Sequence, residues 1–544
     1  MKISKKLLLL MMVALTALVL AACASEPDES GDTSDDAGSG DTADSGEGTE
    51  GEGSGGGDLV IANTSDVVSL DPAGSNDVPS SDVQSNIYET LVKQNMDMEL
   101  EPELATEWEA VEDNVWEFTL REGITFHDGS EFNAEVVKMN IERVMDEEVA
   151  SPRAFLYSMI TEIEVVDDYT VRFHTEYPFS PLPAHLAHSG GSMVSPEVIE
   201  ADYAAMEEGE APGSVINENP VGTGYFKFES WTLGQEVVLT NNEDYWGEPA
   251  KLNSVTFKVV PEDLTRLAEL ETGDSHISNP LSPADVAQIE QTDGLSVMRQ
   301  NSVSTNYIGF NMSKEPFDDE RVRQAISMAI DKEQIIEGIY NGVGIPAKGP
   351  LAPPVFGYDE SLEPLPYDRE RAQELLAEAG YEDGFSTTIW TNDNRQRIDA
   401  ATNVQSQLSE IGIDVEVEIL EWGAYLEQTA NGEHDMFILG WSTATGDADY
   451  GLYALFHSSM VGNPGNRTFT ENEELDALLD EGRRESDPEA RLEIYSEAQE
   501  MLIDMAPWIY LLHSEYLLGV SDQVQGLQQY PTQILDLQNV TLEE

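Results

Sequence analysis

The sequence predicts an α/β fold that is divided into more than one folding unit. Helical and strand patterns alternate over residues 311–514, and the earlier half of the chain is richer in short strands and turns. A chain of 544 residues is too long for one compact core and suggests two or three units. Because 40% of the residues are hydrophobic and 8% are aromatic, most of the chain can bury such cores.

Three segments of the earlier half have strand patterns. Residues 58–62 form a short apolar run, which is typical of a buried strand. Residues 114–120 and 170–174 alternate between apolar and polar side chains, as strands with one buried face do. We therefore expect strands at all three places.

Helices in the second half are marked by apolar stripes and capping residues. Residues 321–339 carry apolar residues at helical spacing and predict one long helix. Asp368 can cap a helix that ends at Gly380. Similar signals predict helices over residues 397–410 and between Asp487 and Pro507, and strands over residues 413–420 and 435–441.

Acidic residues dominate the charge of the chain. Asp and Glu number 105 against 27 Lys and Arg, which gives a net charge of −78 at pH 7. A surface of this sign repels phosphate backbones, so we exclude nucleic acid as a partner. We interpret the acidity as a solvated shell suited to saline or alkaline surroundings, in preference to an acidic site for a cationic ligand.

The N-terminus has the pattern of an export signal over residues 1–22. Three lysines precede an apolar run from Leu7 to Leu20, which is too short to span a membrane comfortably. The run ends in Leu20-Ala21-Ala22-Cys23, which resembles the bacterial lipoprotein signal. This resemblance implies that Cys23 becomes the first residue of the mature chain and anchors it to a membrane through a diacylglyceryl group. A transmembrane anchor and a chance cysteine are the alternatives.

Residues 23–57 predict a flexible acidic tether. Residues 24–57 contain eleven acidic residues, no Lys or Arg, and almost no apolar residue larger than Ala. Such a segment cannot bury enough surface to offset its ordering entropy. Since Cys23 is the single cysteine of the chain, the sequence excludes an intramolecular disulfide and a Cys-rich metal site.

Motifs that are spread over nearly all of residues 58–530 carry a family resemblance. They are Ser69-Leu70-Asp71-Pro72, residues 87–91, Pro102-Glu103-Leu104-Ala105, Trp108, residues 120–134, residues 220–226, residues 241–246 and residues 306–332. In this order they resemble the family 5 extracellular solute-binding proteins of ABC importers. That group holds receptors for dipeptides, oligopeptides, nickel and glutathione.

The resemblance implies a periplasmic-binding-protein-like α/β fold of class II, with two lobes, a hinge and a ligand cleft between the lobes. The first lobe would comprise residues 58–305 and 515–544, with an inserted subdomain at about 100–216, and the second lobe residues 306–514. Such a protein is no enzyme and needs no cofactor. It would be a monomer that captures a small molecule by closing its lobes and delivers it to a membrane permease and its ATPase. Its place would be the extracytoplasmic face of the cell membrane, at the cell surface or in the periplasm.

The resemblance implies that the loop after the strand at residues 435–441 lines the cleft. Receptors for dipeptides and oligopeptides resemble one another in that each has an aspartate three positions after the residue equivalent to Trp441. This chain has Ala444 at that position. Alanine makes no charge-assisted hydrogen bond. The loop instead resembles the glutathione branch, and so does the pair at residues 390–391. The resemblance therefore implies as ligand-binding residues Trp441, Thr443, Thr445, Asp447, Asp449, Tyr450, Trp390, Thr391 and Asn392.

The charges of glutathione point to further candidates. Its two carboxylates need cationic or amide donors, and Arg153, Arg395 and Arg397 stand out in a chain with few cations. Asp447 or Asp449 would accept its ammonium. Tyr88 and Asn311, which lie in the motifs above, complete the candidate site. Surface ion pairs for the arginines, loop capping for Asp449 and core packing for Trp441 are the alternative roles.

Two other functions are left open by these patterns. One is a nickel or metal-chelate receptor of the same fold, and the other is a surface protein without a transport role, either a hydrolase or an adhesive envelope protein. His185 and His188 have the spacing of helical metal ligands, but no nearby His or Cys completes a set, so we expect no metal site. The chain has no HExxH, GxSxG or GxxxxGK[ST] motif, so we expect no catalytic residues.

Overall fold

The computed structural model describes residues 56–462 and 465–543. The predicted signal, the predicted acylation site at Cys23 and the predicted tether up to residue 55 lie outside the described residues.

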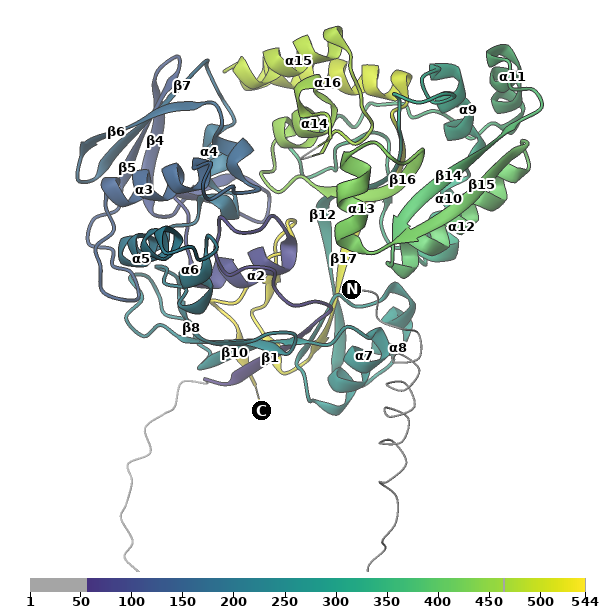
Figure 1. Cartoon of the computed structure of the whole chain (residues 1–544). Helices are drawn as coiled ribbons and strands as arrows, with labels where there is room; N and C mark the ends of the chain where they lie inside the picture. The colour runs from purple at the N-terminus through teal and green to yellow at the C-terminus, as the bar shows by residue number, and fades with distance from the viewer. Residues whose placement is uncertain (1–55, 463–464, 544) are drawn as a thin grey trace, which may run out of the picture. The chain divides into compact units, whose positions relative to one another are not determined.

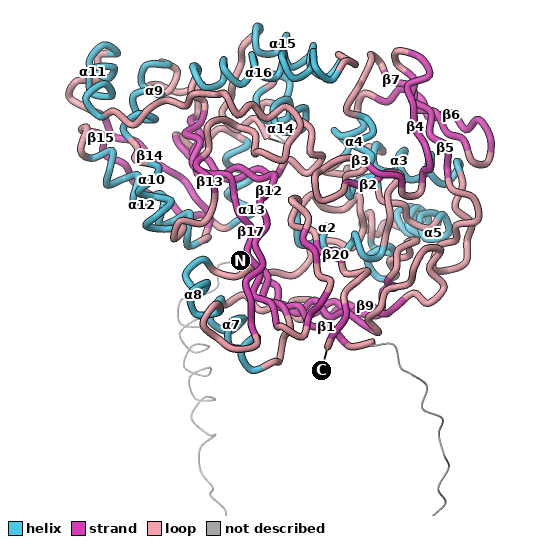
Figure 2. The backbone as a smooth tube through the Cα atoms, turned by 180° about the vertical axis from the view of Figure 1, so that it is seen from behind, coloured by secondary structure: helices cyan, strands magenta, loops and turns pink. Residues whose placement is uncertain are grey.

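A mixed sheet of eleven strands runs through the described part of the chain (Figures 1 and 2). Its strands lie in the order β15 (Ile413–Leu420), β14 (Phe385–Asn392), β16 (Met436–Ser442), β12 (Leu295–Phe310), β17 (Trp508–Ser521), β11 (Ile277–Asn279), β1 (Asp58–Asn63), β10 (Ser254–Val259), β9 (Glu236–Asn241) and β8 (Phe226–Thr232), and β13 (Ile345–Pro346) pairs with β17.

Two long antiparallel strands, β12 and β17, join the two ends of this sheet. Residues 295–301 of β12 pair with residues 515–521 of β17, beside β11 and β1. Residues 305–309 of β12 pair with residues 508–513 of β17, beside β16. The register shifts between Asn301 and Thr305, so the ladder is interrupted in the middle of both strands. The sheet is therefore built as two halves that share β12 and β17.

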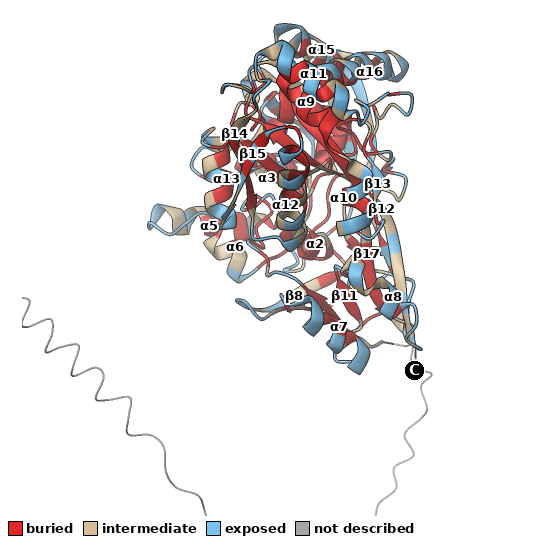
Figure 3. Ribbon diagram, turned by 90° about the vertical axis from the view of Figure 1, so that its right-hand side faces the viewer, coloured by how far each residue is buried: buried red, intermediate tan, exposed pale blue. Residues whose placement is uncertain are grey.

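Buried apolar side chains form separate clusters in the two halves. The largest cluster draws mainly on residues 59–277 and 518–540, and two others draw mainly on residues 303–512. Figure 3 shows buried strands inside and partly exposed helices outside. The arrangement agrees with the predicted two-lobe fold. The predicted lobe boundaries at residues 305 and 515 stay a prediction, and they lie close to the register shift.

A second, antiparallel sheet stands apart from the main one. Its order is β4 (Ala105–Glu112), β5 (Val115–Leu120), β7 (Thr170–Thr175) and β6 (Ile160–Asp167), and helix α3 (Ala134–Met145) contacts β6 and β7. Three two-stranded pairs complete the strands, namely β2 (Val92–Gln94) with β3 (Leu100–Pro102), β18 (Val524–Gln525) with β21 (Thr541–Leu542), and β19 (Gln528–Gln529) with β20 (Leu535–Asp536).

The remaining α-helices surround these sheets (Figure 1). They are α2 (Val78–Ile87), α4 (Leu182–Leu186), α5 (Pro196–Glu207), α6 (Ser214–Glu218), α7 (Asp263–Thr272), α8 (Val286–Ile289), α9 (Glu320–Ala329), α10 (Lys332–Ile339), α11 (Arg369–Ala379), α12 (Arg395–Ser409), α13 (Trp422–Ala430), α14 (Ala448–Phe456), α15 (Glu473–Arg484) and α16 (Pro488–Met505).

Most predicted elements are confirmed to within a few residues, but the single helix over residues 321–339 is wrong. The chain forms α9 and α10 there, and Ile330 between them has an extended backbone with φ −94° and ψ 118°. Asp331 accepts a hydrogen bond from the backbone N–H of Gln334 and so begins a new helix. An aspartate that caps a helix start competes with helix continuation, which explains the break.

Helix α2 is fixed from two directions. Arg143 of α3 forms a bidentate ion pair with Asp71, in the loop before α2, with contacts of 3.0 and 2.8 Å, and it contacts Asp202 of α5 at 2.9 Å. The backbone N–H of Leu535 donates to Asp82 Oδ1 of α2 at 2.8 Å. These contacts bring the loop before α2 and the C-terminal segment together around one helix.

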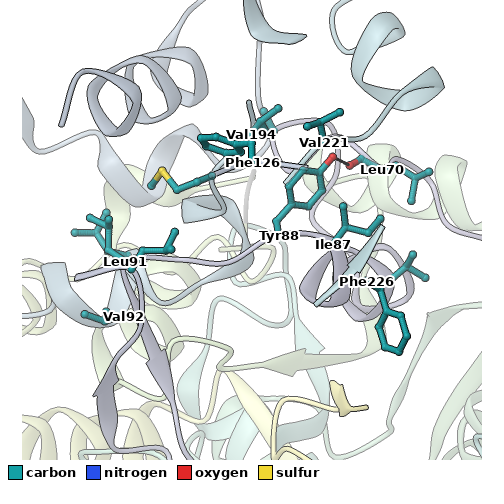
Figure 4. Packing of buried hydrophobic residues seen from close by; sticks show 14 of the residues in the cluster. Leu70, Ile87, Tyr88, Leu91, Val92, Phe126, Val194, Val221 and Phe226 are labelled. Atoms are coloured by element: carbon teal, nitrogen blue, oxygen red, sulfur yellow. Dashed lines mark hydrogen bonds between the residues drawn. The ribbon is translucent and has the colours of Figure 1, made fainter. Parts of the chain in front are cut away.

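The loop at residues 220–226 packs closely against the C-terminal end of α2. A Cβ atom on Gly222 would lie 2.1 Å from the carbonyl oxygen of Ile87, and one on Gly224 would lie 2.7 Å from the same oxygen. Figure 4 shows Val221 and Ile87 together with Tyr88, whose hydroxyl donates to Leu70 O at 3.0 Å. Only glycine allows the two backbones to approach in this way.

We expect Gly222→Ala to lower the free energy of unfolding by roughly 2 kcal/mol or more, because its Cβ collides with backbone. Gly338→Ala is the matched control: it lies in α10, nothing lies within 4 Å of the added Cβ, and it should stabilise the protein by about 0.5–1 kcal/mol. Urea unfolding measures both changes. Equal effects of the two substitutions would contradict the close packing of residues 220–226 on α2.

The buried carboxyl group of Asp82 should make the free energy of unfolding depend on pH. Burial raises the pKa of Asp82 to about 7, and the hydrogen bond from Leu535 only partly offsets this. In the unfolded chain the carboxyl ionises near pH 4, so the free energy of unfolding should fall as the pH rises from about 4 to about 7. Asp82→Asn retains an acceptor for Leu535 but does not titrate. Relative to this variant, the wild type should lose about 3 kcal/mol between pH 5 and pH 8, measured by urea unfolding. The exposed Asp97→Asn is the control, and a pH-independent difference would contradict the prediction.

Candidate functional site

A cavity of about 1200 Å³ is lined by residues from both the earlier and the later part of the chain. The earlier part of the chain contributes the N-terminal half of α2 with the loop before it, and also Phe155 and His188. The later part contributes Ser304 and Asn306 of β12 and residues 439–442 of β16. The C-terminal residues 530–538 also line the cavity. A space that both lobes enclose suits the capture of a small molecule.

Aromatic side chains form one wall of the cavity. The rings of Trp441 and Tyr450 lie 5.1 Å apart, and Tyr450 stacks on Phe155 at 5.8 Å. Within the described part of the chain, Trp441 Nε1 is buried and has no hydrogen-bond partner. This wall offers flat apolar surface to the cavity.

Two arginines of the later part of the chain line the cavity. Arg397 of α12 donates to Asn392 Oδ1 at 3.1 Å, and its guanidinium lies 5.9 Å from the centre of the Trp422 ring. Arg467 donates from Nε to Thr429 Oγ1 at 3.1 Å. Burial raises the pKa of Tyr425, and the positive charges of Arg397 and Arg467 both act against this shift, which places both cations near one residue. Such a pair can bind a carboxylate.

An acidic pair lines another part of the cavity. Glu89 accepts hydrogen bonds from Tyr245 Oη at 2.6 Å and from Trp246 Nε1 at 2.8 Å. Burial and the nearby charge of Glu103 raise the pKa of Glu89 to about 7. Near neutral pH this pair therefore carries less than its full negative charge.

Of the residues that the sequence predicts for the site, Trp441, Tyr450, Tyr88 and Arg397 line the cavity. Tyr88 is 2% exposed and packs among the residues of Figure 4, so it contributes mainly core. The other predicted residues are absent from the cavity lining: Thr443, Thr445, Asp447, Asp449, Trp390, Thr391, Asn392, Arg395, Arg153 and Asn311. Asn392 reaches the cavity only through its hydrogen bond with Arg397.

The two predicted acceptors for an ammonium are held in buried ion pairs. Asp447 pairs with both terminal nitrogens of Arg491, at 3.0 and 2.8 Å, and caps α14. Asp449 lies 3.1 Å from Arg483 Nε and 3.2 Å from His185 Nε2. Burial acts to raise the pKa of Asp449, but the charge of Arg483 and the contact with His185 hold it at about 2. In this structure both carboxylates are therefore paired with cationic side chains of the protein itself.

Five further predicted residues lie away from the cavity lining. Arg153 is fully buried and donates to Pro72 O, Gln84 Oε1 and Ser81 Oγ, and burial lowers its pKa to about 10. The side chain of Arg395 is 91% exposed. Trp390 and Thr391 are buried in β14, and Asn311 binds the carbonyl oxygens of Gly432 and His434. Sequence reasoning missed Arg467, although the scarcity of cations was a signal for it.

His185 takes part in a contact between the two halves of the chain. Its Nδ1 lies 2.8 Å from Leu156 O and its Nε2 lies 3.2 Å from Asp449 Oδ2. Nearby, Ser180 donates from its backbone N–H to Arg483 O at 3.1 Å and from Oγ to Glu485 O at 2.6 Å. This contact, residues 180–185 against residues 449 and 483–485, joins the halves independently of β12 and β17. In the described part of the chain, no group of three or more His, Cys, Asp or Glu side chains could hold a metal ion.

The chain is similar to known solute-binding proteins over most of its length. A family model described as bacterial extracellular solute-binding proteins, family 5 Middle, matches residues 99–463. The glutathione-binding protein GsiB of Salmonella typhi is 33% identical over 479 residues, which is 86% of this chain and 91% of that protein. GsiB of Pectobacterium atrosepticum is 33% identical over 497 residues, which is 90% of this chain and 94% of that protein.

Two of the solved structures with this fold hold peptides. The periplasmic binding protein DppA of Helicobacter pylori, in complex with the peptide STSA, has a TM-score of 0.81 at 33% identity. The match covers 90% of this chain and 99% of the DppA chain. A dipeptide-binding protein from a Pseudoalteromonas species, in complex with Met-Leu, has a TM-score of 0.81 at 27% identity. The match covers 89% of this chain and 100% of that chain. None of the described helices is long and apolar enough to cross a membrane.

We expect His185→Phe to loosen the contact between the two halves, because a phenyl ring donates no hydrogen bond to Asp449 or Leu156. The loss of the buried hydrogen bond with Leu156 O and of the contact with Asp449 should lower the free energy of unfolding by roughly 1–3 kcal/mol. Small-angle X-ray scattering without added ligand should show a larger radius of gyration. His174→Phe is the matched control, since His174 also lies 3.2 Å from a carboxylate, Glu164, but within one small sheet. An unchanged radius of gyration for His185→Phe would contradict a role of this contact in holding the halves together.

Proposed function

Because the chain belongs to the family 5 bacterial extracellular solute-binding proteins, we propose that it captures glutathione or a short peptide for an ABC importer. The two lobes close on the ligand, and the loaded protein delivers it to a membrane permease and its ATPase. No bond of the ligand is made or broken.

The observation that carries the proposal is that two arginines, Arg397 and Arg467, line a cavity to which the earlier and the later part of the chain both contribute. Glutathione and short peptides carry free carboxylates, which guanidinium groups bind through charge-assisted hydrogen bonds. The aromatic surface of Trp441 and Tyr450 can pack against the rest of such a ligand. A cavity of about 1200 Å³ has room for a molecule of this size.

The names of the relatives support the same class of ligand. GsiB is a glutathione-binding protein, and the two solved structures described above hold short peptides. Ala444 lines the cavity. At the equivalent position, dipeptide receptors share an aspartate, by the resemblance described above. This difference favours glutathione over an ordinary dipeptide.

The N-terminal sequence supports a membrane-anchored place for this receptor. Acylation of Cys23 after removal of residues 1–22 would hold the protein at the extracytoplasmic face of the cell membrane. Residues 23–57 would then separate the binding lobes from the bilayer. The protein would work there as a monomer, with lobes at residues 58–305 plus 515–544 and at residues 306–514.

Calorimetric titration tests the proposal. The mature chain with Cys23→Ser, which removes the predicted acylation site, is titrated with reduced glutathione, oxidised glutathione, Ala-Ala, a pentapeptide and a nickel–histidine mixture. We expect one molecule of a glutathione form or of a peptide to bind per chain. Binding of the nickel mixture alone, or of nothing in the panel, would contradict the proposal.

Two arginines close together in the sequence provide a matched pair of variants. Arg397 lines the cavity, whereas the side chain of Arg395, two residues earlier on α12, is 91% exposed. We expect Arg397→Ala to weaken binding of the ligand by roughly 10- to 100-fold, the usual effect of losing a charge-assisted hydrogen bond. Arg395→Ala should leave the affinity within about twofold. Equal effects of the two variants would contradict the placement of the carboxylate.

A further inference from the structure

The guanidinium of Arg483 lies among aromatic rings from both parts of the chain. Its Cζ atom lies 3.6 Å from the centre of the Tyr453 ring in α14, which belongs to the later part. The same atom lies 5.0 Å from the centre of the Phe179 ring and 5.8 Å from that of the Tyr177 ring, and both rings belong to the earlier part. Asp449 balances the charge, at 3.1 Å from Arg483 Nε. A ring face attracts a cation that lies within about 6 Å, so Arg483 connects the two parts.

Hydrogen bonds add to this connection. Ser180 donates from its backbone N–H to Arg483 O at 3.1 Å and from Oγ to Glu485 O at 2.6 Å. The guanidinium of Arg484 lies 4.8 Å from the centre of the Tyr177 ring. We call these residues the clasp: Tyr177, Phe179 and Ser180 from the earlier part, and Tyr453, Arg483, Arg484 and Glu485 from the later part.

The clasp lies outside the ligand cavity. Within the described part of the chain, no clasp residue belongs to the cavity lining, so a ligand in the cavity does not touch it. The clasp also shares no residue with β12 or β17, the strands that join the two halves of the sheet. The two parts of the chain are therefore connected at a second place, and lobes that move apart about β12 and β17 have to break the clasp.

We propose that the clasp is a gate for the ligand: it holds the two lobes together in the empty and in the loaded protein, and the ligand enters and leaves only while the clasp is open. This inference rests on the proposed function and adds residues that control ligand exchange without touching the ligand. Arg483 is then a positioning residue of the receptor. Because the clasp favours the closed arrangement with and without ligand, it slows both entry and release.

The test weakens the clasp from the side of the earlier part. Replacing Arg483 itself would leave Asp449 as a buried, unpaired charge, which is strongly destabilising. The double variant Tyr177→Ala/Ser180→Ala removes one ring and one hydroxyl donor and retains the ion pair of Arg483 with Asp449. Stopped-flow fluorescence of Trp441, which lines the cavity, follows binding and release. The probe is whichever of reduced glutathione, oxidised glutathione, Ala-Ala and the pentapeptide binds the wild type most tightly.

We expect both rate constants to rise in the double variant. The dissociation rate constant should rise by roughly 5- to 30-fold, the effect of losing one cation–π contact and one hydrogen bond. The association rate constant should rise by about twofold or more, because the empty protein opens more often. Small-angle X-ray scattering without ligand should show a larger radius of gyration for the double variant than for the wild type.

The control variant removes the same two kinds of contact within the later part alone. The guanidinium of Arg369 lies 5.4 Å from the centre of the exposed Tyr367 ring, and Ser409 Oγ donates to Ser406 O at 2.7 Å. Tyr367→Ala/Ser409→Ala should leave both rate constants within about twofold of the wild type.

Two kinds of result separate the clasp from the proposed function. Unchanged rate constants in the double variant, slower association, or a change in dissociation alone would overturn the clasp as a gate and leave the proposed function in place. If the wild type binds no member of the panel, the proposed function fails, and scattering without ligand decides on the clasp. An equal radius of gyration for the wild type and the double variant would then overturn the clasp as well.

Discussion

The pairing of β12 with β17 is the constraint on which the rest of the structure depends. These two strands belong to both halves of the main sheet, so they set how the halves can lie relative to each other. Strands of sixteen and fourteen residues make a stiff connection, which register shifts after Asn301 and after Asn306 interrupt near its middle. The cavity lies beside this interruption, since Ser304, Asn306, Ser514 and Tyr516 belong to its lining. Bending at the shift would therefore change the cavity directly.

The scarcity of cations shapes the rest of the molecule. With 27 Lys and Arg against 105 Asp and Glu, few acidic groups can have a basic partner. Several buried arginines form ion pairs within the protein: Arg143 with Asp71 and Asp202, Arg483 with Asp449, and Arg491 with Asp447. Breaking such a buried pair leaves an uncompensated charge, which is strongly destabilising. Arg397 and Arg467 also have protein partners, Asn392 and Thr429, and in addition they line the cavity, where a ligand can approach them.

The cavity therefore combines three kinds of surface in separate places. Arg397 and Arg467 supply positive charge from the later part of the chain, Glu89 and Glu103 supply carboxyl groups from the earlier part, and Trp441 with Tyr450 supplies aromatic surface. This separation suits a small molecule with opposite charges at its two ends. The contact of His185 with Asp449 lies outside the cavity lining and joins the halves without touching a ligand. Ligand binding and lobe contact thus use different residues.

Local sequence determined the elements, and tertiary structure decided which side chains face the cavity. Asp368 and Gly380 bound α11 as expected, and residues 413–420 form β15, because capping and periodicity act within a few residues. The motifs also determined the family. The site was harder: Arg395 and Arg397 differ by about 200° around α12, so only one of them lines the cavity. Asp447 and Asp449 lie in the expected loop, but their partners Arg491 and Arg483 are 44 and 34 residues away. No local pattern reveals such pairing, since it arises when α15 packs beside both α14 and α16.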